Sequence, residues 1–267
     1  MKPTTSAALV LLAFVLGRLM LKGPLGGAYA ELCFVLATVM LISAARKVSE
    51  LFGGNAKKVW QILVCGFVVW LVGDLIFFLG GLFPEGETLT AISATGTFIF
   101  ILGNLILAYG LLSEADRLPF KSGKNAVISV AVGLLFLSVF SGGYLYKLLS
   151  GNAINTVEKT VVFFITLTDA SIVALGLYLF LIYGGIFREA WKTFSAGSVF
   201  VATGDALAIY LFMKGISDRW LFLSDCIWAV GYALLWVGMW KITQVLNVSA
   251  NPENKIQLGK KGRAKKS

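Results

Sequence analysis

The chain has 267 residues, of which 58% are hydrophobic and only 14% charged, with a mean hydropathy of +0.83 and a net charge of +9. A soluble domain is about 45–50% apolar and about 25% charged, so this composition indicates a protein of the lipid bilayer and excludes a mainly disordered protein or a collagen. Three cysteines cannot form a disulfide scaffold, and the absence of histidine excludes a His-ligated haem, a histidine-bound zinc and a Ser-His-Asp triad. We expect no cofactor and no metal site.

Eight apolar segments are each long enough to cross a bilayer as a helix, which takes about 20 mostly apolar residues. They are apolar on every face, whereas the strands of a membrane barrel alternate in polarity. The sequence therefore predicts an all-α polytopic membrane protein with eight transmembrane helices. In chain order these helices cover about 5–21, 28–45, 59–83, 90–112, 127–148, 160–185, 195–214 and 221–243.

The positive charges predict the orientation of these spans. Lys and Arg are concentrated in the connections 46–58, 117–124 and 188–192 and in the tail 245–267. Short loops rich in Lys and Arg remain in the cytoplasm, so we expect a protein of the cell membrane with both termini cytoplasmic. The basic, disordered tail is expected to rest on anionic lipid. No aromatic residue follows Trp240 to stack on bases, so no nucleic-acid partner is expected.

An internal repeat relates the two halves of the chain. The third and seventh segments each carry one Gly-Asp, and the segment after each carries two glycines seven residues apart. Because each half has four spans, the halves have the same orientation and are related by an axis along the membrane normal. For the glycines, close helix packing is favoured over a role in binding a ligand. The predicted units are a first half 1–112, a cytoplasmic linker 113–126 and a second half 127–244, and the repeated motifs are Gly73-Asp74, Gly103 and Gly110, and Gly204-Asp205, Gly231 and Gly238.

Five acidic residues inside the predicted spans are the main indication of function. An ionised carboxylate at the centre of a spanning helix costs about 2.5–3.5 kcal/mol on insertion scales, so such groups normally face a bundle interior, pair, protonate or line water. The predicted orientation puts all five in the outer half or at the midplane, which predicts an acidic pocket that opens outward. Its expected members are the acids Glu31, Asp74, Asp169, Asp205 and Asp225, with Asn104, Tyr210, Trp228 and Tyr232.

Each acid taken alone is explained as well by an interhelical hydrogen bond as by binding of a proton, a cation or a ligand. The expected hydrogen-bond partners are Thr168, Ser171, Thr203, Asn104 and Ser224. No Lys or Arg lies deep in a span; Arg18, near the outer end of the first, is the nearest.

Two patterns resemble known families. The series Asp169, Gly204-Asp205 with Tyr210, and Asp225 with Trp228 and Gly231-Tyr232 resembles the poorly characterised multi-span regions that occur alone in archaeal proteins or precede diguanylate cyclase and histidine kinase domains. That resemblance implies a sensory input module. A second resemblance is to the eight-span lysoplasmalogenase-type family, which implies hydrolysis of a lipid vinyl ether. That family has Gly-Asp, Gly-His and Ser-Asp where this chain has Gly73-Asp74, Gly103-Asn104 and Gly204-Asp205.

The expected function is therefore a receptor-like module that binds a small ligand, a cation or a lipid in the acidic pocket and signals through a separate cytoplasmic partner, since the tail is too short for an output domain. A transporter of cations or cationic solutes, coupled through Asp74 and Asp205, is the first alternative, and a lipid hydrolase is the second. An intramembrane aspartic protease using Asp169 and Asp205 is disfavoured because the chain lacks the Pro-Ala-Leu motif.

Overall fold

The computed structural model describes residues 3–21, 24–80, 87–119, 123–150, 156–213 and 218–250, and within them every regular element is an α-helix. The remaining residues, including 251–267 of the predicted tail, lie outside the described part. The helices are α1 (Pro3–Met20), α2 (Pro24–Leu51), α3 (Gly54–Gly80), α4 (Glu87–Asp116), α5 (Gly123–Ser150), α6 (Thr156–Ile182), α7 (Gly185–Met213) and α8 (Asp218–Ala250).

Each predicted segment corresponds to one helix, and most helices extend beyond the apolar stretch that predicted them. α8 continues to Ala250, past residue 245, where the tail was expected to begin. Six helices, α2, α3, α4, α6, α7 and α8, are long and apolar enough to cross a membrane, while α1 and α5 contribute the shorter apolar stretches Thr4–Met20 and Gly123–Phe136. The helical membrane class predicted from the sequence is confirmed.

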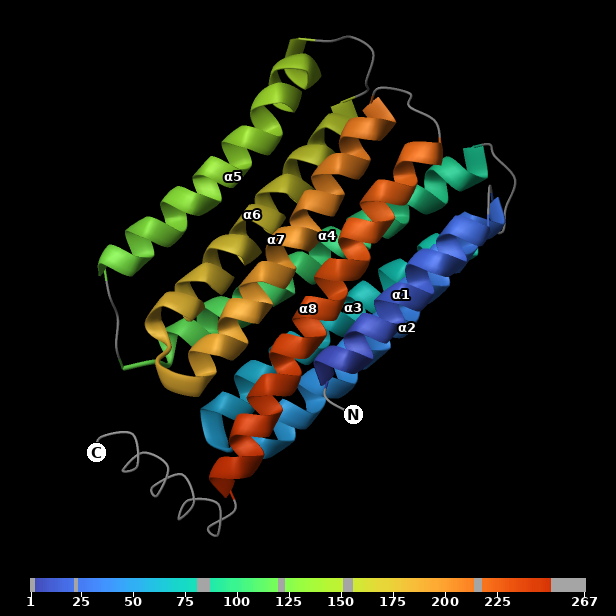
Figure 1. The fold of residues 1–267 in the computed structure, drawn as a ribbon. Helices are drawn as coiled ribbons and strands as arrows, with labels where there is room; N and C mark the ends of the chain where they lie inside the picture. The colour runs from blue at the N-terminus through green and yellow to red at the C-terminus, as the bar shows by residue number, and fades with distance from the viewer. Residues whose placement is uncertain are drawn as a thin grey trace, which may run out of the picture.

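Consecutive helices run in opposite directions through an elongated bundle (Figure 1). α3 packs on α4 and α7 packs on α8, and these are the two most extensive contacts. α2 packs on α3 and α8, and α6 packs on α7 and α4, so each of these helices joins the two pairs. α1 lies against α2 and α8, and α5 lies against α6 at the edge of the bundle (Figure 1).

Glycines allow the closest helix contacts. Gly197 on α7 faces Gly231 on α8, where a Cβ added at Gly231 would lie 2.8 Å from the backbone nitrogen of Val201 and 3.1 Å from the carbonyl oxygen of Gly197. Gly103 on α4 similarly faces Gly66 on α3, with the Gly66 carbonyl oxygen 3.3 Å from a Cβ added at Gly103. Small residues permit this approach in a bilayer, where the hydrophobic effect does not drive helices together. The packing explanation of these glycines is therefore confirmed.

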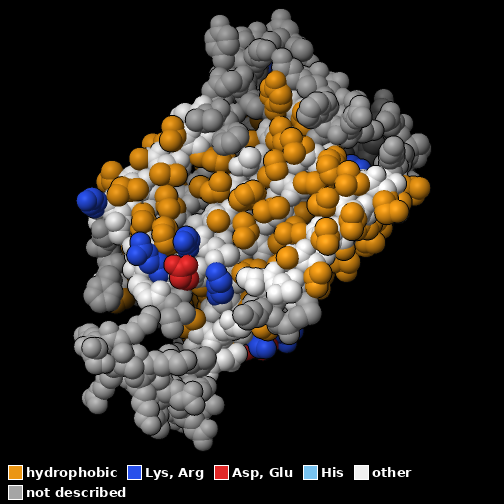
Figure 2. Space-filling model, viewed as in Figure 1, with side chains coloured by type: hydrophobic (Ala, Val, Ile, Leu, Met, Phe, Trp, Pro, Cys, Tyr) orange, Lys and Arg blue, Asp and Glu red, His pale blue; other side chains and the backbone are white. Residues whose placement is uncertain are grey.

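The flank of the bundle is apolar, whereas Lys and Arg gather mainly toward the end at which α7 begins (Figure 2). Exposed apolar side chains occur on the outer helices, among them Leu12 on α1, Phe98 on α4 and Leu135 on α5, each more than half exposed. A soluble monomer rarely exposes so much contiguous apolar surface, so this flank suits contact with lipid chains.

We name the two ends of the bundle for the site description. The Arg18 end is where α1, α3 and α7 finish and α2, α4 and α8 begin. The Glu114 end is where α4 and α6 finish and α3 and α7 begin.

Candidate functional site

A first polar group forms where α2, α3 and α8 meet. The Thr38 hydroxyl donates a hydrogen bond of 2.5 Å to Oδ2 of Asp74, and the Tyr232 hydroxyl is in hydrogen-bonding contact with both residues. All three side chains are buried. Asp74 lies one helical turn beyond Trp70 on the inner face of α3, so its carboxyl is directed to neighbouring helices rather than to lipid.

A second polar group joins α4, α6, α7 and α8. Asn104 Nδ2 donates to Oδ1 of Asp169 at 2.9 Å, and the Asp169 carboxyl interacts with the carboxyl of Asp205. Asp205 also accepts a hydrogen bond of 3.1 Å from Nε1 of Trp228. Asn104 in turn accepts a bond of 2.8 Å from Nε1 of Trp70. Two carboxyl groups that share a buried site repel each other when both are ionised, so a proton or a cation between them lowers the energy of such a pair.

The two groups adjoin through aromatic side chains. The Tyr232 ring lies 5.8 Å from the ring of Trp70 and 5.6 Å from that of Phe34, and it interacts electrostatically with Asp205. Phe34 also packs edge-on against Trp228. Together the groups form the carboxyl cluster, which we define as Thr38, Trp70, Asp74, Asn104, Asp169, Asp205, Trp228 and Tyr232.

An ion pair lies at the Arg18 end of this cluster. Nε of Arg18 on α1 lies 2.8 Å from Oδ2 of Asp225 on α8, and the two side chains are only 10% and 11% exposed. Glu31 on α2 interacts electrostatically with Asp225, Arg18 and Asp74. Glu31 therefore links the ion pair to the carboxyl cluster.

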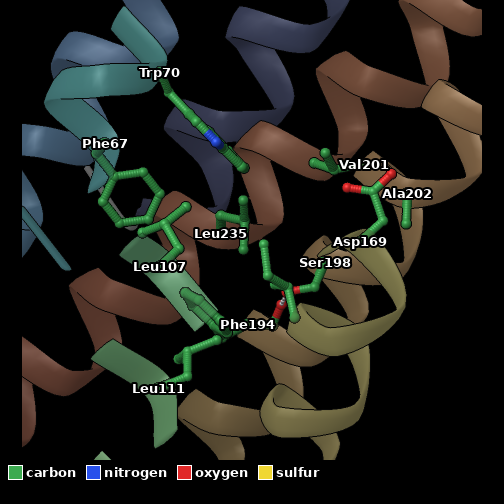
Figure 3. Close-up of a pocket in the computed structure, with 11 residues that line it drawn as sticks. Phe67, Trp70, Leu107, Leu111, Asp169, Phe194, Ser198, Val201, Ala202 and Leu235 are labelled. Carbon is green, nitrogen blue, oxygen red and sulfur yellow. Dashed lines mark hydrogen bonds between the residues drawn. The ribbon is translucent and has the colours of Figure 1, made fainter. Parts of the chain in front are cut away.

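A small cavity lies on the other side of the cluster. The cavity is large enough for about one water molecule, whose centre can lie anywhere within about 10 Å³. Relative to Asp169, its lining residues lie toward the Glu114 end. Figure 3 shows the Asp169 carboxyl at one side of the cavity and aromatic and aliphatic side chains across from it; the lining comprises Phe67, Trp70, Leu107, Leu111, Asp169, Ile172, Phe194, Ser198, Val201, Ala202 and Leu235.

A second buried ionic group closes the Glu114 end. Glu114, 1% exposed, accepts hydrogen bonds of 2.5 Å from Nε and Nη2 of Arg117 and from the hydroxyl of Tyr183. Tyr183 stacks on Trp191, and the Arg117 guanidinium lies 5.3 Å from the ring centre of Phe52. Burial and the neighbouring Glu114 raise the pKa of the Tyr183 hydroxyl above its usual value. This group fastens the α6–α7 turn to the end of α4.

The structure brings together most of the expected site residues. Asp74, Asn104, Asp169, Asp205, Trp228 and Tyr232 belong to the carboxyl cluster, and Glu31 and Asp225 lie between it and Arg18. Tyr210 is 44% exposed and lies on the surface of α7. It is five residues from Asp205, about 140° around a helix, so the two side chains point in different directions. Among the described residues, no group of three or more Asp, Glu or Cys is arranged to hold a metal ion.

The expected hydrogen-bond partners of the acids were partly wrong. Asn104 does bond an acid, and Thr168 accepts from Asn104 at 3.2 Å. The hydroxyls of Ser171, Thr203 and Ser224 instead donate to carbonyl oxygens of their own helices, a common alternative for hydroxyls in apolar surroundings. The sequence analysis overlooked Thr38, Trp70 and Glu114. Thr38 alone had a usable signal, since it precedes Asp74 by the same number of residues as Asp169 precedes Asp205.

In comparisons with known proteins, no family model, curated protein or solved structure matches the chain.

Proposed function

We propose that the chain is a receptor-like membrane module of eight spans, arranged as two four-helix halves, whose carboxyl cluster binds a small cation or a cationic ligand. The observation that carries the proposal is the close approach of the Asp169 and Asp205 carboxyls from two helices, with the Asp74 carboxyl in the adjoining polar group, among neutral hydrogen-bond donors. A cation, a proton or both would balance their charge. A purely structural network would need fewer acids, because neutral amides and hydroxyls satisfy interhelical hydrogen bonds at lower cost.

Equivalent contacts in the two halves support the repeat. A Cβ added at Gly73 would meet Phe100, and one added at Gly204 would meet Trp228. These two rings occupy equivalent positions, because each lies three residues before the first glycine of its repeated pair, Gly103 or Gly231. A Cβ added at Gly110 would meet the side chain of Leu63, and one added at Gly238 would meet the backbone of Phe194. Leu63 and Phe194 are again equivalent, because each lies three residues before a glycine of its own helix, Gly66 or Gly197.

The turns before α3 and α7 support the same relation. Gly54 and Gly185, which begin these helices, both adopt a left-handed backbone conformation, with φ of 56° and 59°. The residue two before each glycine, Phe52 or Tyr183, stacks on the tryptophan of the helix that follows. Those tryptophans, Trp60 and Trp191, contact each other at 6.2 Å between ring centres, which is the contact expected of halves that pack on equivalent residues.

Charge and position support an outward-facing Arg18 end. Lys57, Lys58, Arg117, Lys124, Arg188 and Lys192 all lie near the Glu114 end, where α3, α5 and α7 begin and α4 finishes. If this end faces the cytoplasm, as the positive-inside rule implies, a cation from outside enters near Arg18 and Asp225. Both termini are then cytoplasmic, and a separate cytoplasmic protein would read the state of the Glu114 end.

Transport of a cation is the second candidate. The observation that favours it is the cavity between Asp169 and the Glu114 end, because a carrier needs a route from its binding site to the second side of the membrane. A receptor needs no such route. Cation flux into liposomes that contain the purified protein separates the two candidates, since a receptor binds without flux.

The test is thermal unfolding of the purified full chain with Na⁺, K⁺ and methylammonium over a range of pH. A ligand that binds only the folded state stabilises it by about 2.7 kcal/mol at one hundred times its Kd. We expect at least one of these cations to raise the unfolding temperature of the wild type and to leave that of Asp205→Asn unchanged. The matched control is Glu189→Gln, which removes an exposed carboxyl from the same helix and should respond as the wild type does. An equal response in Asp205→Asn would refute the proposal.

A further inference from the structure

Arg18 is the basic group that reaches the acids leading to the carboxyl cluster. Its guanidinium contacts Asp225 and interacts with Glu31, which itself interacts with Asp74. A cation entering from the Arg18 end meets these same carboxyls first. We propose that Arg18 is a built-in competitor for the cation: its guanidinium occupies Asp225, close enough to act on the charge of Glu31, and a cation passes to Asp74 when this arginine releases. The inference rests on the proposed function and adds the control of access to it.

The charges at this end make the competition direct. An arginine side chain is always ionised in proteins, so Arg18 supplies a permanent positive charge. With Arg18 in place, Asp225 is neutralised and the potential at Glu31 is less negative. With Arg18 withdrawn, two carboxyls face the path to Asp74 and attract any small cation. An incoming cation and the guanidinium therefore exclude each other by charge as well as by volume.

α1, which carries Arg18, packs on two helices and is exposed on its other side. Among the described residues α1 lies against α2 and α8, and its outer face is exposed at Leu9, Leu12 and Leu19, each about half exposed. The carbonyl oxygen of Ala13, nearer the start of α1, accepts a 3.0 Å hydrogen bond from the Tyr29 hydroxyl. Release is therefore a movement of the Arg18 side chain, with the contacts of Ala13 and Gly17 with Tyr29 kept.

The α1–α8 ion pair is therefore an access control rather than part of the cluster itself. The apparent Kd of a site equals the intrinsic Kd divided by the fraction of molecules that are competent to bind. If Arg18 is engaged in about nine molecules of ten, removing it lowers the apparent Kd about tenfold.

The experiment compares Arg18→Gln with the wild type, using the purified full chain and the apparent Kd for Na⁺ and for methylammonium from thermal unfolding at constant ionic strength. We expect the apparent Kd to fall about tenfold in Arg18→Gln. The matched control Arg18→Lys keeps the positive charge and should stay close to the wild type. Guanidinium ion at millimolar concentration should raise the apparent Kd of Arg18→Gln again and leave that of the wild type little changed. An apparent Kd in Arg18→Gln equal to or above the wild-type value would overturn the proposal.

A second variant covers the possibility that Arg18→Gln does not fold, since it leaves Asp225 buried without its partner. Arg18→Gln combined with Asp225→Asn removes both charges, and its reference is Asp225→Asn alone, in which Arg18 still faces Glu31. The double variant should bind the cation more tightly than this reference, and equal binding would overturn the competitor role. Loss of binding in Asp205→Asn with no effect of Arg18→Gln would retain the proposed function and reject the competitor.

Discussion

The contact of α7 with α8 gives a quantitative test of the packing. In Gly231→Ala the new methyl group would lie 2.7 Å from Cγ2 and 2.8 Å from the backbone nitrogen of Val201, and 3.1 Å from the carbonyl oxygen of Gly197. Ordinary contacts of a Cβ atom lie at 3.4–4 Å. A side chain can turn aside, but two of these three atoms are backbone, so the helices themselves must separate.

The cost follows from that separation. A gap of about 0.5–1 Å loses a quarter to a half of the dispersion energy of the atoms along it, and overpacking a close contact typically costs about 1–3 kcal/mol. Alanine is favoured over glycine by about 1 kcal/mol inside a helix, which offsets part of this. We therefore expect Gly231→Ala to lower the free energy of unfolding by about 1–2 kcal/mol. Gly27 on α2 is the matched control, because a Cβ added there meets no atom within 4 Å. Gly27→Ala should leave the stability unchanged or raise it by up to about 1 kcal/mol.

Unfolding by SDS in mixed micelles, followed by the fluorescence of the seven tryptophans, measures both variants. The reasoning is refuted if Gly231→Ala is as stable as the wild type, or if Gly27→Ala loses as much stability. Gly197→Ala in the facing helix adds a further check, since its Cβ would meet the backbone nitrogen of Leu235 at 2.7 Å. Both substitutions push apart the same two helices. In the double variant Gly197→Ala/Gly231→Ala, the loss of stability should therefore be smaller than the sum of the two single losses. Strictly additive losses would show that the helices do not separate as a unit.

Two further predictions concern Tyr183 at the Glu114 end and Asp169 in the carboxyl cluster. Burial and Glu114 raise the pKa of Tyr183, so the unfolded chain loses this proton first, and stability should fall as the pH rises above about 10, the usual tyrosine pKa. Tyr183→Phe should remove this part of the pH dependence in unfolding measured from pH 8 to 11, and an unchanged slope in the variant would contradict it. Asp169→Thr puts a threonine beside Asp205, as Thr38 lies beside Asp74. It should fold and elute as the wild type in size-exclusion chromatography but lose stabilisation by cations, and retained stabilisation would show that Asp169 is not needed for binding.

The positions of the helices and the burial of the acids could be predicted from the sequence, because both depend on local composition. A run of about 20 apolar residues specifies a helix in lipid without reference to the rest of the chain. A carboxyl within such a run must face inward wherever its helix packs, and Asp74, Asp169 and Asp225 are each less than 10% exposed.

The identity of the partners could not be predicted, because it depends on which helices meet. Arg18 and Asp225 come from opposite ends of the chain, and no local pattern indicates their pairing. Glu114 lies among charged residues near the end of α4 and was indistinguishable from a solvated helix end. Its burial comes from the α6–α7 turn, whose Tyr183 covers it.

The proposed repeat accounts for the location of the carboxyl cluster. Both halves share the glycines and the Gly-Asp, which fix how closely their helices approach, but they differ in the residues beside each aspartate. In the first half Asp74 accepts a hydrogen bond from Thr38, whereas in the second Asp205 interacts with the carboxyl of Asp169. A symmetric frame with two Thr–Asp pairs would carry one carboxyl in each half, each satisfied by a neutral donor. This chain instead has Asp169 at the position that corresponds to Thr38, which adds a carboxyl beyond the two of that frame. In the proposed function, this extra carboxyl, to which Asn104 of α4 donates, is the charge that a cation balances.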